Sequence, residues 1–208
     1  EVDNDGTAIG YAFDRKREYG PAGYDRTHVV TLDFVYELPK PIKSGSFAGQ
    51  LVNGWQLNGI TRFWTGPPLT ITSNGNPGTL GGGVRANYLG GDIFPAEQSR
   101  RNYFNVLAFG RPPEGNLGNV GKYVLRRPGI NQWDLSLFKN LRATERVNVQ
   151  FRFETFNTFN HTQWDGVNNG LSVPNPGAAV TEATRGSFGE VNSTRDPRSI
   201  QFGMKLLF

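Results

Sequence analysis

Hydrophobic and polar residues alternate one by one along several stretches of the chain. The alternation runs through Thr27–Leu38, Trp55–Thr65, Trp133–Leu141, Val147–Glu154 and Ser199–Phe208, with Thr7–Phe13 as a weaker sixth case. Successive side chains of a β-strand point to opposite faces, so a period of two predicts strands with one apolar and one polar face. Convincing helical periodicity is absent. The pattern therefore predicts an all-β chain with about six antiparallel strands.

The predicted strands are long. They have about 9–12 residues, whereas strands of soluble proteins most often have about 5–6. A strand that crosses a membrane at a tilt needs about 9–11 residues. Strand length therefore favours a transmembrane β-barrel segment over a soluble sandwich.

The connections between the predicted strands alternate between shorter and very long ones. The shorter ones are Leu38–Trp55 and Leu141–Val147, and the long ones are Thr65–Trp133 and Glu154–Ser199. Long loops are uncommon inside compact soluble domains, whereas outer-membrane barrels combine short periplasmic turns with long extracellular loops. If Phe208 ends at the periplasmic side, both long connections become extracellular.

Composition excludes several functional classes. The chain of 208 residues has no Cys, which excludes disulfides, Cys nucleophiles and iron–sulfur clusters. Its net charge of +4 is spread along the chain rather than clustered, so nucleic acid is not an expected partner. No run approaches the ~18–20 apolar residues of a membrane helix. The first residues carry neither an initiator Met nor a signal peptide, so we expect a processed product or a fragment of a longer chain.

Charged residues on the polar faces are candidates for the lumen of the barrel. A charge that faces lipid at mid-membrane costs ~2–4 kcal/mol, so these side chains should point inward. The candidates are Asp33, Arg62, Arg152 and Glu154. In this interpretation Leu32, Phe34, Leu135, Phe151 and Phe202 face lipid. The lumenal charges can pair with one another, hold a plug or guide a solute.

Four aromatic residues assigned to the loops are candidates for ligand contacts. They are Trp64, Tyr88, Tyr103 and Trp164, which we expect to be exposed or half-exposed. Such rings can stack on sugars or peptides, and they can equally pack a long loop against itself.

Motifs for catalysis, metals and cofactors fail on inspection. Gly115–Lys122 resembles a phosphate-binding loop, but Asn116 stands where the first Gly is required and Tyr123 where Ser or Thr is required. His28 and His161 are the only histidines, and two ligands do not make a zinc site. We therefore expect no enzyme activity, no metal and no cofactor.

Several segments resemble the C-terminal barrel region of TonB-dependent receptors of the Oar-like, carboxypeptidase-regulatory-domain-containing type. The segments are Tyr24–Pro39, Gly54–Pro68, Gly118–Asn140, Thr144–His161 and Gly186–Phe208. The resemblance spans roughly 20–208, with gaps in the loops. An aromatic last residue on an alternating strand, here Phe208, is similar to the signal that the barrel assembly machinery reads.

The resemblance implies a plugged barrel of about 22 strands, with an N-terminal region that meets TonB. This sequence shows about six strands and neither plug nor coupling box. We therefore interpret residues 1–208 as the C-terminal part of such a barrel in the bacterial outer membrane. It would supply barrel wall and extracellular loops for binding and uptake of an unknown ligand. Its partners would be membrane lipid, the assembly machinery and, through the missing region, TonB.

Two other interpretations stay open at this point. One is a soluble all-β module that binds carbohydrate, and the other is a small complete barrel that acts as an adhesin or pore. The first predicts that Ile200, Phe202, Met204 and Leu206 are buried under a second sheet, whereas a barrel leaves them facing outward. The second requires about eight strands and pairing of the first strand with the last.

Overall fold

The computed structural model describes residues 14–42, 46–78 and 83–208. The weak strand expected over Thr7–Phe13 lies outside these residues. The chain divides into two compact units. We call His28–Trp64, Ile130–Gln163 and Arg195–Phe208 the strand unit. The loop unit consists of Thr65–Gly129, Trp164–Thr194 and the described part of Glu1–Thr27.

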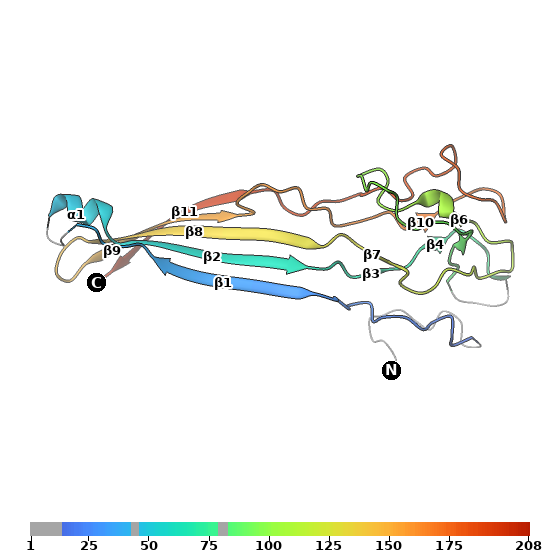
Figure 1. Ribbon diagram of the computed structural model, residues 1–208, viewed down its shortest axis with the longest axis horizontal. Helices are drawn as coiled ribbons and strands as arrows, with labels where there is room; N and C mark the ends of the chain where they lie inside the picture. The colour runs from blue at the N-terminus through green and yellow to red at the C-terminus, as the bar shows by residue number, and fades with distance from the viewer. Residues whose placement is uncertain (1–13, 43–45, 79–82) are drawn as a thin grey trace. The chain divides into compact units, whose positions relative to one another are not determined.

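The strand unit is built on one five-stranded antiparallel sheet. Its strands are β1 (Val29–Glu37), β2 (Trp55–Trp64), β8 (Ile130–Arg142), β9 (Asn148–Phe156) and β11 (Ser199–Leu207). Their order in the sheet is β1-β2-β8-β9-β11, so each strand pairs with its nearest long neighbour in the chain (Figure 1). All five expected strands are confirmed, with ends shifted by at most three residues.

Cross-strand register sorts the side chains into an apolar and a polar face. One row across the sheet joins Tyr36, Leu57, Leu137, Phe153 and Phe202, each opposite the next. The adjacent row, on the other face, joins Val35, Asn58, Ser136, Glu154 and Gln201. A shift of one residue would exchange the two faces, so this register is specified by the alternation itself.

Gly59 shows why the apolar face needs a small residue at one point. A Cβ atom on Gly59 would lie 2.4 Å from the Phe34 ring and 2.8 Å from Leu135. The glycine therefore makes room for a large aromatic ring from the neighbouring strand. The Phe34 ring therefore packs closely over Gly59 even though this face of the sheet is exposed.

No second sheet covers the apolar face in the described part of the chain. Ile200, Met204 and Leu206 are exposed, and Phe202 is 78% exposed. This contradicts burial in a two-sheet core, which the soluble-module interpretation requires, and it agrees with outward-facing barrel strands. Among the described residues, no helix has the length and apolar character needed to span a membrane.

The connections leave the sheet as the alternation predicts. Residues 38–54 and 143–147 join strands at one end, and 65–129 and 157–198 join them at the other. The first connection contains the helix α1 (Phe47–Val52), and the C-terminus lies at the same end of the sheet (Figure 1). Ser46 caps this helix, its Oγ accepting from the Gly49 N–H at 2.9 Å. Six residues are too few for helical periodicity to be recognised in the sequence.

The loop unit has an aromatic core of its own. Its short elements are β3 (Pro68–Leu69), β4 (Thr72–Ser73), β5 (Asn87–Tyr88), η2 (Val106–Ala108), β6 (Phe109–Gly110), β7 (Leu125–Arg126) and β10 (Gly170–Leu171). Phe104, Phe109 and Phe188 are fully buried and meet edge to face, with ring centroids 5.0–6.3 Å apart. The connections are therefore a packed structure.

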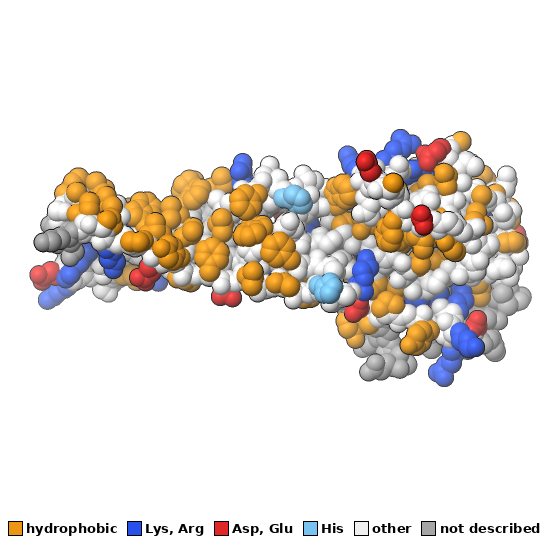
Figure 2. Space-filling model, viewed as in Figure 1, with side chains coloured by type: hydrophobic (Ala, Val, Ile, Leu, Met, Phe, Trp, Pro, Cys, Tyr) orange, Lys and Arg blue, Asp and Glu red, His pale blue; other side chains and the backbone are white. Residues whose placement is uncertain are grey.

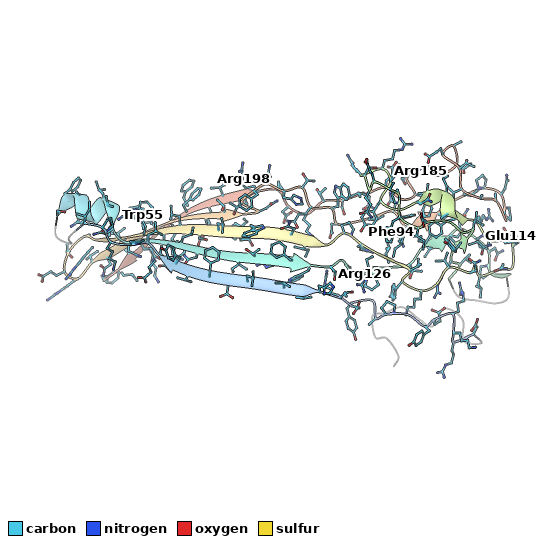
Figure 3. The ribbon with its side chains drawn as sticks, in the orientation of Figure 1. Trp55, Phe94, Glu114, Arg126, Arg185 and Arg198 are labelled. Carbon is cyan, nitrogen blue, oxygen red and sulfur yellow. The ribbon has the colours of Figure 1, made fainter. Side chains whose placement is uncertain are left out.

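Buried arginine side chains replace regular hydrogen bonding in the loop unit. Arg185, marked in Figure 3, is almost fully buried and donates to the carbonyls of Arg101 and Phe188 and to the Asn102 side chain. Irregular backbone exposes carbonyl groups that secondary structure would otherwise satisfy. One guanidinium has five N–H donors in a fixed plane, so it can satisfy several of these carbonyls at once.

Candidate functional site

The four lumenal candidates share one face of the sheet. Asp33 and Arg62 lie on β1 and β2, and Arg152 and Glu154 lie on β9. Cross-strand pairing places all four on the face that also carries Asn58, Ser136 and Gln201. The apolar residues expected to face lipid lie on the opposite face. That the polar face lines a lumen stays a prediction.

An ion pair joins β2 and β8 on the polar face, near the end of the sheet from which the long connections leave. Arg62 Nη1 lies 3.1 Å from Asp134 Oδ2. Asp134 also accepts from Gln132 Nε2 at 2.9 Å and from the Asn157 N–H at 3.0 Å, and only 12% of its side chain is exposed. Asp134 was not among the predicted site residues. The alternation places it on the polar face, but its pairing with Arg62 depends on register between distant strands.

Arg152 and Glu154 are less strongly engaged. Arg152 Nε donates to Gln150 Oε1 at 2.7 Å, and its guanidinium lies 4.8 Å from the centre of the Phe138 ring. Within the described ranges, neither side chain forms an ion pair. These charges therefore remain available to groups that approach the polar face.

The aromatic candidates occupy three different environments. Trp64 is the last residue of β2, and its Nε1 donates to Thr31 Oγ1 at 3.2 Å, so it is a strand residue rather than a loop residue. Tyr88 is exposed, with its ring 6.0 Å from that of Phe109. Trp164 is partly buried and packs against the loop-unit core. Only Tyr88 presents an exposed ring.

For Tyr103 the expectation of exposure is wrong. Its ring is buried, lies 6.3 Å from the Trp164 ring, and donates its hydroxyl to the Arg126 carbonyl at 3.0 Å. Burial disfavours the charged phenolate and raises the pKa of Tyr103 to about 12. Tyr103 therefore packs the loops together, which is the second of the two roles considered for these rings.

A basic hollow in the loop unit was not predicted. It encloses about 600 Å³, and its lining includes Tyr24, Arg85, Lys122, Tyr123 and Arg127. Glu18 is the only carboxylate that lines it, and Glu18 Oε2 lies 2.6 Å from Arg85 Nη2. The hollow is thus lined by three cationic side chains and by one carboxylate, which is already paired with Arg85. The residues come from segments that are far apart in the chain, around Tyr24, Arg85 and Lys122, so local sequence patterns could not reveal the hollow.

Arg17 adds positive charge next to the lining of this hollow, beside Glu18. Its Nη2 donates to the carbonyls of Gly83 and Leu117, and its side chain is mostly buried. Burial, and secondarily the charge of Arg85, lower the pKa of Arg17, while Glu18 offsets part of this shift. Arg17 and Arg85 together carry two positive charges and Glu18 carries one negative charge. The excess positive charge favours binding of an anion in this region.

A second hollow of about 400 Å³ shares Arg127 and Asn169 with the first. Its other lining residues include Asn168, Ser187 and Asn192. Amide and hydroxyl groups both donate and accept hydrogen bonds. Together the two hollows form a surface suited to a polar ligand that carries negative charge.

The described residues contain no cluster of three or more His, Asp or Glu side chains that could hold a metal. His28 and His161 are both exposed. The absence of enzyme activity stays a prediction. Phe208 lies just beyond β11 and is fully exposed, and its role as an assembly signal also stays a prediction.

Comparison with known proteins identifies the class. A family model described as an outer membrane beta barrel domain matches residues 1–201. The chain therefore belongs to this family, and its location is the bacterial outer membrane. The predicted all-β barrel fold and the predicted location are thereby confirmed. No curated protein and no solved structure matches the chain.

Proposed function

We propose that the chain forms wall and extracellular loops of a TonB-dependent, Oar-like outer-membrane receptor that binds and takes up a ligand without covalent chemistry. The sequence resemblance to this family motivates the finer assignment. The observation that carries it is the open sheet, whose edge strands β1 and β11 each lack a partner on one side among the described residues. In a membrane every backbone group must be paired. Further strands must therefore pair with β1 and β11 to close the barrel. A large receptor barrel contains such strands.

The two faces of the sheet fit this role. A largely apolar face suits lipid, and the charges of Arg152 and Glu154 suit contacts with a plug inside a wide barrel. Ligand binding is assigned to the loop unit because its connections leave the sheet opposite the short, periplasmic turns. The basic hollow, with the exposed Arg127 on its rim, is where an anionic ligand would bind.

Two measurements on the complete receptor test the proposal. Cells that produce it are supplied with labelled ferric siderophore, oligosaccharide, peptide or cobalamin, with and without a protonophore. A TonB-dependent receptor accumulates one of these only when the inner membrane is energised.

The purified receptor is also placed in a planar bilayer. A plugged barrel conducts no ions, whereas open single-channel steps would establish a pore and overturn the proposal.

Charge reversal in the hollow tests the binding surface separately. Arg127→Glu should weaken binding of the accumulated ligand while leaving the amount of assembled receptor unchanged. Arg142→Glu is the matched control, because Arg142 is an exposed arginine at the end of β8, in the strand unit. Equal binding by both variants would remove the hollow from the proposal.

A further inference from the structure

Lys139 is a charged residue on the face that meets lipid. Cross-strand pairing places it between Trp55 and Phe151, in line with the apolar side chains of the sheet. The residue is nevertheless buried, with 7% of its surface exposed. A cation in such a position needs polar partners, because lipid offers it none.

The partners come from the C-terminal turn of α1. Lys139 Nζ donates to the Gln50 carbonyl at 2.5 Å and to the Asn53 carbonyl, and it lies 5.2 Å from the centre of the Trp55 ring. Free carbonyls at a helix C-terminus favour a cation. These bonds hold the end of α1 on the apolar side of the sheet.

Two further contacts fix the same turn. Trp55 Nε1 donates to the Leu51 carbonyl at 3.1 Å, and Figure 3 shows Trp55 at the α1 end of the sheet. Gly54, between α1 and β2, has φ +80°, and a Cβ there would lie 2.6 Å from the Asn140 carbonyl oxygen. The chain therefore turns back tightly onto the sheet, and the placement of α1 follows from specific bonds.

The rest of α1 presents apolar side chains outward. Gly49 is the only buried residue of the helix, whereas Phe47 is 79% exposed and Leu51 and Val52 are also exposed. Positions 47, 48, 51 and 52 share one side of a helix, because residues four apart are neighbours on its surface. In Figure 2 the hydrophobic side chains over α1 continue into those of the neighbouring strands.

We propose that α1 is an interfacial helix of the periplasmic leaflet, with Phe47, Leu51 and Val52 inserted among lipid chains and Lys139 as its anchor. The occupant is lipid because the helix surface continues the lipid-facing surface of the barrel. Lys and Trp at the boundary are typical of membrane interfaces. An amphipathic helix in this setting lies in the plane of the membrane. The inference depends on the barrel family, on an apolar face that meets lipid and on periplasmic placement of the short turns, and it is independent of ligand uptake.

Depth-dependent quenching tests the position of the helix. Single cysteines replace Leu51 on the apolar side, Gln50 on the opposite side, and Glu145 in the β8–β9 turn of the complete, otherwise Cys-free receptor. Each carries a small environment-sensitive fluorophore, and only heat-modifiable receptor in phosphatidylethanolamine–phosphatidylglycerol vesicles is measured. The probe at Leu51 should be quenched strongly by lipids brominated near the headgroup. Iodide should quench it several-fold less than it quenches the probe at Glu145.

A substitution at Lys139 tests the anchor. Lys139→Met keeps an unbranched apolar stem for the barrel wall but removes both hydrogen bonds to α1. Combined with the probe at Leu51, it should raise iodide quenching toward the level at Glu145, while Lys139→Arg keeps the protected state.

Three results would overturn the proposal. Iodide quenching at Leu51 that equals quenching at Glu145 in the otherwise unchanged receptor would place α1 in the periplasm. Protection from both iodide and brominated lipid would identify a protein partner in place of lipid. Continued lipid quenching in Lys139→Met would refute the anchoring role of the lysine.

Discussion

The loop unit should lose its structure when one aromatic ring is removed from its core. Phe104 is fully buried and meets Phe109 and Phe188 with centroid distances of 5.8 and 5.0 Å. Phe104→Ala should cost about 3–5 kcal/mol for lost burial and the cavity left behind. Each lost ring pair contributes ~0.5–1.5 kcal/mol beyond area, which favours the upper half of that range. Domains are stable by only about 5–15 kcal/mol, so much of the stability of the unit would be lost.

Surface proteolysis on intact cells measures this effect. The variant protein should remain heat-modifiable and embedded in the membrane, because the strand unit does not contain Phe104. Its long connections should be cleaved many times faster by added protease than those of the unchanged protein. Leu107→Ala is the matched control, because Leu107 is a 51% exposed neighbour in η2 and should cost about 1 kcal/mol or less. Equal protease resistance of the two variants would refute the claim that the aromatic cluster holds the loops together.

Three further predictions concern other parts of the molecule. The folded-state pKa of Tyr103 is raised from 10.0 to about 12, so its contribution to stability is full below pH 10 and is lost as the pH rises to 12. The denaturation midpoint of the loop unit should fall in that window, and Tyr103→Phe should remove this part of the fall. Phe208→Asp places a charge near the interface at ~0–1 kcal/mol, too little to unfold a barrel. We expect a large loss of heat-modifiable protein with unchanged ligand binding per assembled molecule, which would indicate lost recognition by the assembly machinery. Normal assembly with weakened binding would contradict this role of Phe208. A membrane-impermeant thiol reagent should label Arg152→Cys and spare Phe153→Cys, and equal labelling would show that the faces are assigned wrongly.

The long strands were predictable because each obeys a single local rule. Apolar and polar residues alternate along most of each strand, and residues such as Phe151 and Arg152 reveal their faces without knowledge of any partner strand. The burial of Tyr103 could not be predicted in this way. Its environment is made by segments far away in the chain, including Trp164, and no local period reports such contacts.

The ion pair between Arg62 and Asp134 was only half visible in the sequence. Alternation places both residues on polar faces, but their contact depends on the register between β2 and β8, which are separated by a connection of 65–129. The anchor of α1 was hidden for another reason. Lys139 breaks the apolar pattern of its face, and only the position of the Gln50 and Asn53 carbonyls explains why the break is tolerated.

The two long connections are one folded object rather than two loops. The strand β4 of the first pairs with β10 of the second, and Phe104 of the first packs on Phe188 of the second. Neither connection can therefore be grafted alone onto another barrel, because each carries half of a shared core. Their sequences should diverge in step during evolution, and insertions should be tolerated only at exposed tips such as Pro113–Gly115. A barrel of this design can replace its long connections only as a matched pair of segments.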